Sequence, residues 1–199
     1  IGFPSSVGQV VVGDLDRSGS PDVVTCLQAL DRIVVLFNDG MGFFPREDID
    51  EYVAGTNPVS QAVVDIDNDG DLDLYIGNED SQSISGNFGP QQNNPGLKAP
   101  CQLFQNNGDG TFEDIADQAG VENLRFTKAV VWGDYNNDGF SDLFLSNLGQ
   151  PNRLYHNNGN GTFTDRADVL SITKPIHSFP AWFWDFNNDG ILDIYVSSY

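Results

Sequence analysis

The chain has 199 residues and a formal net charge of −20 at pH 7, from 9 basic and 29 acidic side chains. It contains no basic patch of the kind that nucleic-acid binding requires, and no apolar run of transmembrane length. We therefore expect neither a nucleic-acid partner nor insertion into a membrane.

The same order of elements recurs four times along the chain. An apolar run, at residues 10–12, 62–64, 129–132 and 181–184, leads into an acidic loop. An alternating strand follows each loop, at 23–25, 74–76, 143–145 and 194–196. The first three repeats continue with a third strand at 32–37, 101–104 or 152–155. An Asn-Gly or Asp-Gly type of turn, a strong hairpin signal, then precedes a short fourth strand at 42–44, 111–112 or 162–163.

Aspartate in the loops accounts for most of the acidity of the chain, which has 24 Asp against 5 Glu. Fourteen Asp residues lie in the four loops, and outside them the balance is 15 acidic against 9 basic side chains. Like charges at this density repel one another unless a cation sits among them. A simple exposed acidic turn is a poor alternative, because four copies agree. The net charge is therefore mainly the charge of expected metal sites.

Each loop has nine residues, with Asp at positions 1 and 9, Gly at position 6, and Asp, Asn or Ser at positions 3 and 5. Alternating oxygen ligands suit calcium better than zinc or copper, and glycine permits the sharp turn. Position 7 varies, which fits a ligand donated by its backbone carbonyl. The candidate metal ligands are Asp14, Asp16, Ser18, Ser20 and Asp22; Asp65, Asp67, Asp69, Asp71 and Asp73; Asp134, Asn136, Asp138, Phe140 and Asp142; and Asp185, Asn187, Asp189, Ile191 and Asp193.

These loops differ from EF-hand loops at position 12. An EF-hand needs a bidentate Glu there and a helix after it. The four loops have Thr25, Ile76, Leu145 and Val196 at that position, inside segments that are typical of strands. The sequence therefore predicts calcium loops between strands rather than between helices.

Four-stranded antiparallel units of about 50 residues are typical of β-propeller blades. We name the strands of a blade A to D, so that the acidic loop joins A to B. The sequence predicts an all-β fold: one partial propeller domain over residues 1–199, with blades at about 6–57, 58–121, 126–170 and 178–199. The loops begin at 14, 65, 134 and 185, so the steps are 51, 69 and 51, and the long step indicates an inserted B–C loop at 79–100.

The fourth blade has segments for strands A and B alone, which makes about three and a half blades. We expect an open arc, with an unpaired strand edge at 194–196 and an uncovered side on the first blade. Two explanations stay open. Further blades in a longer polypeptide close the ring, or a neighbouring copy completes the fourth blade in a head-to-tail assembly.

Four stretches combine the acidic loops and hairpin turns with their flanking strands: LFQNNGDGTFEDIADQAGV (103–121), VVWGDYNNDGFSDLFLSN (130–147), NRLYHNNGNGTFTD (152–165) and WDFNNDGILDIYVSS (184–198). They resemble the FG-GAP/VCBS repeat family, the calcium-loop propellers related to the integrin α head, in the branch that includes cartilage acidic protein. The resemblance covers nearly the whole chain. It implies a β-propeller that holds up to four calcium ions through loop positions 1, 3, 5 and 9 and the backbone carbonyl of position 7. The first loop departs from the pattern, with Arg17 inside it and Ser18 at position 5, so we expect its site to be the weakest.

Several other residues have a structural and a functional interpretation. Trp132, Trp182 and Trp184 are expected to pack between blades rather than to form a ligand platform. Cys26 and Cys101 form at most one disulfide, and the alternative is two buried small apolar side chains. The sequon that begins at Asn160 permits glycosylation, but the repeat turn also explains it.

The predicted function is a calcium-stabilised extracellular binding or adhesion module, because extracellular calcium modules work at high calcium concentration. We expect a protein or glycan partner on the face opposite the calcium loops, where the insert lies, or further copies of the chain. Deleting residues 81–97 should then weaken partner binding and leave folding and calcium binding intact.

Two alternatives stay open: a structural subunit of an extracellular fibre or surface assembly, and a propeller-scaffold enzyme acting on polysaccharide through paired carboxylates. A catalytic pair occurs once, whereas these carboxylates recur in every repeat. His156 and His177 have no nucleophile motif beside them and are expected to be structural. We therefore expect no enzyme activity, no catalytic residues and no cofactor besides calcium.

Overall fold

The structure, a computed structural model, describes residues 7–45, 49–79 and 100–198. Its strands form three antiparallel sheets of four strands and one of two, each in chain order. The first sheet comprises β1 (Val7–Gly13), β2 (Asp22–Leu27), β3 (Arg32–Leu36) and β4 (Ile49–Val53), with a 3₁₀ turn, η1 (Gln28–Leu30), between β2 and β3.

The second sheet comprises β5 (Pro58–Val64), β6 (Asp73–Asn78), β7 (Gln102–Asn106) and β8 (Phe112–Asp114), and the short helix α1 (Ala116–Ala119) follows it. The third comprises β9 (Thr127–Gly133), β10 (Asp142–Asn147), β11 (Arg153–Asn157) and β12 (Phe163–Asp165). The fourth pairs β13 (Ser178–Trp184) with β14 (Asp193–Ser198).

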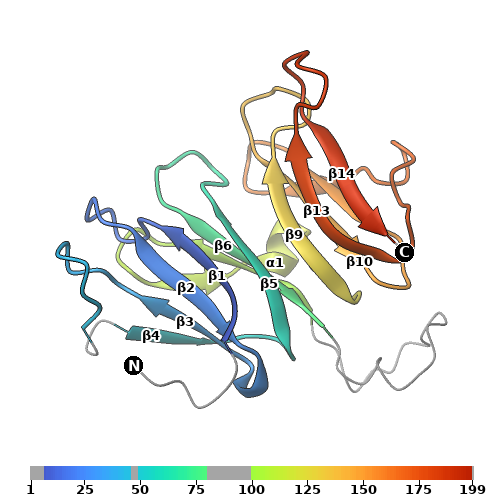
Figure 1. Cartoon of the computed structure of the whole chain (residues 1–199). Coiled ribbons are helices and arrows are strands. Elements are labelled where there is room, and N and C mark those ends of the chain that lie inside the picture. The colour runs from blue at the N-terminus through green and yellow to red at the C-terminus, as the bar shows by residue number, and fades with distance from the viewer. Residues whose placement is uncertain (1–6, 46–48, 80–99, 199) are drawn as a thin grey trace.

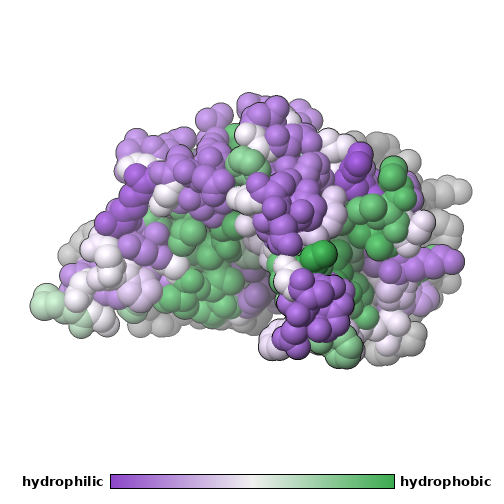
Figure 2. Space-filling view, turned by 90° about the horizontal axis from the view of Figure 1, so that it is seen from above, coloured by the Kyte–Doolittle hydropathy of each residue, from purple (hydrophilic) through white to green (hydrophobic). Residues whose placement is uncertain are grey.

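The predicted fold class is confirmed: the chain is all-β, built from propeller-type blades, and the sheets do not close into a ring. The blades stand side by side, from β1–β4 at one end to β13–β14 at the other (Figure 1). The loops that join β5 to β6 and β13 to β14 project from the top of this view. Seen from above, hydrophilic residues cover much of that face (Figure 2). These two acidic loops therefore lie on one face of the blade array. Hydrogen bonds also join the first loop to the second and the third to the fourth.

The fourth strand of the first blade is not where the sequence indicated. We expected it at 42–44, but β4 runs from Ile49 to Val53 and pairs residue by residue with β3, from Arg32 opposite Val53 to Leu36 opposite Ile49. Phe43 instead closes the preceding turn, because its carbonyl accepts the Asp39 N–H at 3.0 Å. A five-residue pairing offers more ladder hydrogen bonds than the expected three-residue strand, which explains the shift.

Apolar side chains pack between neighbouring blades. Tyr75, on β6, is fully buried, donates its hydroxyl to the Val121 carbonyl at 2.8 Å, and meets the edge of Trp132 with ring centroids 6.2 Å apart. Similar clusters join the first blade to the second and the third to the fourth. Helix α1, which the sequence did not predict, places Ala116 and Ala119 in the same cluster as Tyr75. Three of the hydrophobic clusters among the described residues therefore lie between neighbouring blades, whereas a smaller one, around Leu27, Val34 and Leu36, lies within the first blade.

Two of the three tryptophans do not pack between described blades. Trp132 does, but Trp182 is 44% exposed and Trp184 is 64% exposed. Trp182 stacks on Tyr195 of its own sheet, with ring centroids 4.2 Å apart. The prediction was wrong for these two residues because no described blade lies against that face of the β13–β14 sheet.

Cys26 and Cys101 form no disulfide with each other; they are two free, fully buried side chains, which was the alternative to a disulfide. Their thiols lie in different polar surroundings: Cys26 Sγ is 2.6 Å from Gln61 Oε1, and Cys101 Sγ is 3.2 Å from Thr127 Oγ1. Over the described residues, the structure contains no helix with the length and apolarity needed to span a membrane.

Candidate metal centre

All four acidic loops share one backbone framework. The position-1 carboxylate accepts a hydrogen bond through Oδ2 from the N–H of the position-6 glycine, at 2.8–2.9 Å in each loop. The glycines have φ between +83° and +92°, in the region where a Cβ is unfavourable, so the turn requires glycine. Position 4, which is Arg17, Asn68, Asn137 or Asn188, is also left-handed, with φ between 56° and 60°. The four loops are therefore copies of one local conformation.

Three of the four position-9 carboxylates are buried where the next strand begins, and the fourth, Asp193, is exposed. Asp22, Asp73 and Asp142 are at most 2% exposed. Asp73 accepts hydrogen bonds from the backbone N–H groups of Ile66 and Asn106, both at 2.9 Å. Corresponding pairs of bonds hold Asp22 and Asp142. Each carboxylate thus joins its loop to the end of strand C in its own blade.

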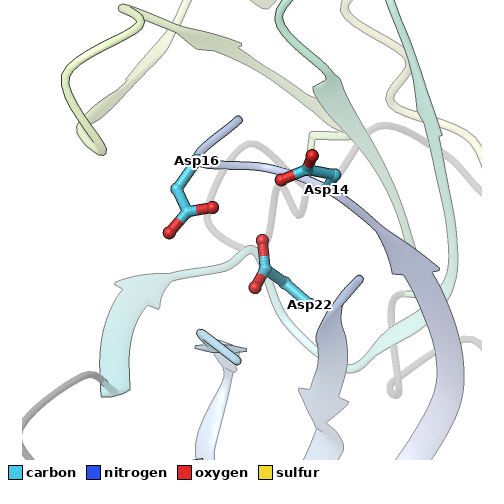
Figure 3. A group of neighbouring side chains, drawn as sticks. All are labelled: Asp14, Asp16 and Asp22. Atoms are coloured by element: carbon cyan, nitrogen blue, oxygen red, sulfur yellow. The ribbon is translucent and has the colours of Figure 1, made fainter. Parts of the chain in front are cut away.

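In the first loop the carboxylates of Asp14, Asp16 and Asp22 face a common space (Figure 3). One oxygen from each lies within 4.8 Å of the others, and Asp65, Asp67 and Asp73 of the second loop are grouped in the same way. The Oδ1 atoms of Asp14 and Asp65 are buried and accept no hydrogen bond. Since a buried carboxylate oxygen without a partner is costly, a cation among these oxygens fits the donor set well.

The third and fourth loops use their position-1 carboxylates differently. Asp134 Oδ1 accepts the N–H of Asp138 at 3.1 Å, and Asp185 Oδ1 accepts the N–H of Asp189 at 3.0 Å. Position 3 is Asn in both loops, and its amide donates to the position-5 carboxylate at 2.8 and 2.9 Å. The structure thus brings three carboxylates together in each of the first two loops. In the third and fourth loops, the oxygens at positions 1 and 5 instead accept hydrogen bonds from within the loop. The whole ligand set stays a prediction.

Two residues near the loops were missed as site residues. Gln105 Nε2 donates to Asp67 Oδ2 at 3.0 Å, and His156 Nδ1 lies 3.1 Å from Asp142 Oδ1 and 3.9 Å from Asp138 Oδ2. Both precede the Asn that ends strand C, so they are equivalent positions of two blades. That alignment was visible in the sequence as the residue before each Asn-Asn-Gly turn.

The loops also connect neighbouring blades. Asn106 of the second blade donates through Nδ2 to the Leu15 carbonyl of the first loop, and Asn157 of the third blade donates to the Ile66 carbonyl of the second loop, both at 2.8 Å. These carbonyls belong to loop position 2. A change in loop conformation therefore reaches the interface with the next blade directly.

The position of Arg17 in the sequence suggested that its side chain lies over its own loop, but it does not. Its side chain reaches the second loop, where Nε is 2.6 Å from Asp71 Oδ1. The expectation that the first site is the weakest therefore rests on Ser18 at position 5 and remains a prediction.

Burial acts on the ionisation of the position-9 carboxylates. Desolvation raises the pKa of Asp73 to about 7, against the hydrogen bonds from Ile66 and Asn106, which lower it. Desolvation likewise raises the pKa values of Asp22 and Asp142 above the ordinary value of 3.8. Keeping these groups ionised without a nearby cation therefore costs folding free energy.

This burial predicts a pH dependence for the metal-free protein. Between 3.8 and about 7 the folded chain keeps a proton on Asp73 that the unfolded chain releases, so stability falls as pH rises through this window. We expect the melting temperature in metal-free buffer to decrease from about pH 4.5 to about pH 7. With saturating calcium the decrease should be smaller, because a cation favours the ionised form. A metal-free melting temperature that rises across the window would contradict this expectation.

Two further predictions concern other parts of the chain. The predicted insert, 79–100, lies outside the described residues except for Glu79 and Pro100. Asn160 is exposed, and its Oδ1 accepts hydrogen bonds from both the N–H and the hydroxyl of Thr162, which shows the turn role of the sequon. Its glycosylation stays a prediction.

Comparison with known proteins agrees with the repeat pattern. A family model described as the FG-GAP-like repeat matches residues 14–76, 93–145 and 134–196. The chain is 38% identical over 104 residues to cartilage acidic protein 1 of Xenopus tropicalis, which covers 50% of this chain and 16% of that protein. It is 33% identical over 136 residues to cartilage acidic protein 1 of Homo sapiens, which covers 68% of this chain and 20% of that protein. The chain therefore spans a fifth or less of the length of these relatives.

Proposed function

The chain belongs to the FG-GAP-like repeat family, and from this membership we propose that it is a calcium-stabilised binding module of the extracellular space. The observation that carries the proposal is the pair of converging carboxylate groups, each with a buried position-1 oxygen that accepts no hydrogen bond. These oxygens leave a place for a cation in the framework of the first two loops. Calcium, when bound, supplies positive charge and accepts several oxygen ligands in a flexible geometry.

The residues of this chain then determine what calcium stabilises. Buried position-9 carboxylates, such as Asp73, hold the loop to strand C of the same blade. Asn106 and Asn157 hold the first and second loops to the neighbouring blades. Neutralising the carboxylates removes their mutual repulsion at these junctions. We infer that calcium stabilises the packing of blade on blade, as well as the loops themselves.

The proposal is tested by melting the chain in chelator, in millimolar calcium and in millimolar magnesium. A ligand that binds the folded state stabilises it by RT ln(1 + [L]/Kd), or about 2.7 kcal/mol per site at a hundredfold excess. We expect a clear rise in melting temperature with calcium and a smaller one with magnesium, which dehydrates reluctantly. Asp65→Asn should reduce the calcium increment, whereas Glu113→Gln, which removes a charge on β8, should not. Identical curves in chelator and calcium would refute the metal role.

The proposed binding function requires a partner and a surface on which it docks. Strand order places the A–B loops and C–D turns at one end of each blade and the B–C and D–A connections at the other. Since binding residues concentrate on loops, we propose that a protein or glycan docks on the end opposite the calcium loops. Binding of the full chain and of the 81–97 deletion to immobilised glycans and matrix proteins tests this, and equal binding by the deletion would refute it.

We propose no catalytic role. The carboxylates occur as four copies of one backbone framework, whereas an acid–base pair needs one distinct constellation.

A structural or assembly role is the second candidate, because one blade face is apolar and exposed. In the first three blades, loop position 2 and position 11 pack against the next blade. In the fourth blade these positions are Phe186 and Tyr195, which are 83% and 52% exposed, and Trp184 beside them is 64% exposed. The equivalent packed pairs are Leu15 with Val24, Ile66 with Tyr75, and Tyr135 with Phe144.

The matching surface lies on the first blade of a second copy. Val12, 57% exposed, stands where Trp132 and Phe183 pack against their preceding blades. For the assembly role we therefore propose a head-to-tail contact between these faces, which is a heterologous interface. Light scattering at increasing concentration tests it: self-association that both Trp184→Asp and Val12→Asp abolish supports the contact, and a chain that stays monomeric refutes it.

A further inference from the structure

Arg17 crosses from the first blade to the second. It occupies position 4 of the first loop, where a left-handed backbone with φ of 56° turns its side chain outward from its own loop. Nε donates to the Gly70 carbonyl at 3.2 Å and lies 2.6 Å from Asp71 Oδ1. Nη2 donates to the Asp69 carbonyl at 2.5 Å. Nη2 also lies 3.7 Å from Asp69 Oδ1. The guanidinium therefore contacts two backbone carbonyls and two carboxylates of the second loop, of which Asp71 is the closer.

Asp71 is the unusual member of the second loop. Position 7 holds Ser20, Phe140 or Ile191 in the other three loops, so a carboxylate is not part of the repeated pattern. The Asp71 side chain is 7% exposed, and it stands outside the group formed by Asp65, Asp67 and Asp73. A carboxylate this buried needs a charged or hydrogen-bonding partner, and Arg17 supplies one.

The same contact occurs without charge between the third and fourth blades. Asn137, at position 4 of the third loop, donates through Nδ2 to the carbonyl of Gly190, at position 6 of the fourth loop, at 3.0 Å. The backbone geometry that links position 4 of one loop to position 6 of the next is therefore shared. What distinguishes Arg17 is its positive charge and its pairing with Asp71.

We propose that Arg17, from the first blade, sets the calcium affinity of the second loop. It does so by holding the Asp71 carboxylate away from the cation and by placing a positive charge beside the site. This inference rests on the proposed calcium function. The second loop has five carboxylates, more than any other loop. Arg17 pairs closely with Asp71 and more distantly with Asp69. It stabilises the metal-free loop and opposes the approach of a second positive charge.

Replacing Arg17 by Asn tests the charge and keeps the residue type that the other three loops have at position 4. We expect Arg17→Asn to lower the melting temperature in chelator, because Asp71 loses its partner. We expect the calcium affinity of the second loop to rise about threefold to tenfold, as two positive charges no longer face each other at the site. A purely structural contact predicts the opposite sign, with weaker calcium binding when it is lost.

Replacing Asp71 tests the other half of the pair. Asp71→Asn should weaken calcium binding by about threefold to tenfold, because it removes the charge that offsets Arg17 but removes no expected ligand oxygen, since position 7 is expected to ligate through its backbone carbonyl. Asp67→Asn, which removes a member of the converging group, should weaken binding by more than about tenfold. The two variants remove the same charge from the same loop, so they are matched controls for each other.

The measurement is a calorimetric calcium titration of the full chain and each variant, with Asp65→Asn identifying the binding event that belongs to the second loop. Tighter binding in Arg17→Asn, together with a smaller loss of affinity in Asp71→Asn than in Asp67→Asn, supports the inference. Unchanged or weaker binding in Arg17→Asn, or a loss in Asp71→Asn as large as in Asp67→Asn, overturns it. Absence of calcium binding by the unaltered chain instead refutes the proposed function, so the two failures are distinguishable.

Discussion

Tyr75→Ala is expected to destabilise the chain by about 3–5 kcal/mol, the range for truncating a large buried aromatic side chain. Tyr75 is fully buried between the second and third blades, beside Trp132, and bonds the Val121 carbonyl through its hydroxyl. Truncation leaves a cavity and an unpaired buried acceptor. Urea unfolding in saturating calcium measures the change, and Tyr75→Phe should cost about 1 kcal/mol because it removes the hydroxyl alone.

Tyr195 is the matched control for this experiment. It occupies the same position 11 in the fourth blade but is 52% exposed and stacks on Trp182. Tyr195→Ala should therefore cost less than about 1 kcal/mol. Equal losses at the two positions would contradict the assignment of the buried cores to the faces between blades.

Asp73→Ala is expected to cost about 2–5 kcal/mol in saturating calcium, because it leaves two buried backbone donors, Ile66 and Asn106, without an acceptor. It also removes one of the three converging oxygens of the second loop. The calcium increment in melting temperature should fall with the stability, since one carboxylate serves both roles.

Asp193→Ala provides the comparison at the same loop position. The Asp193 side chain accepts the Phe186 N–H at 3.1 Å, but the residue is exposed. Water can replace that bond, so we expect a loss below about 1 kcal/mol. If Asp73→Ala is no more costly than Asp193→Ala, the carboxylate does not hold the loop to strand C.

The loops and their blades were predictable from the sequence because their determinants are local. Gly70 needs no partner from another blade to make the turn, and Asp65 finds its hydrogen-bond donor five residues away. The same nine-residue motif at four places in the sequence then indicated four copies of one structural unit. The fold class follows from the order of the strands that flank each copy.

Contacts between blades were harder to predict from the sequence. Arg17 looked like a defect of its own loop, but its partners lie more than 50 residues away, and no local pattern indicates them. His156 looked like an isolated histidine until strand pairing placed it beside Asp142. The exposure of Trp184 depends on which blade lies against it, and that is a property of the arrangement rather than of the β13 sequence.

The most direct test of the calcium assignment is the number of calcium ions that the chain binds at equilibrium. Dialysis against labelled calcium counts them, for the unaltered chain and for Asp65→Asn and Asp14→Asn. The account predicts several bound ions, up to one per loop, and the loss of one ion in each variant. A chain that binds no calcium at millimolar concentration, or a count that both substitutions leave unchanged, would contradict the assignment of calcium to these loops.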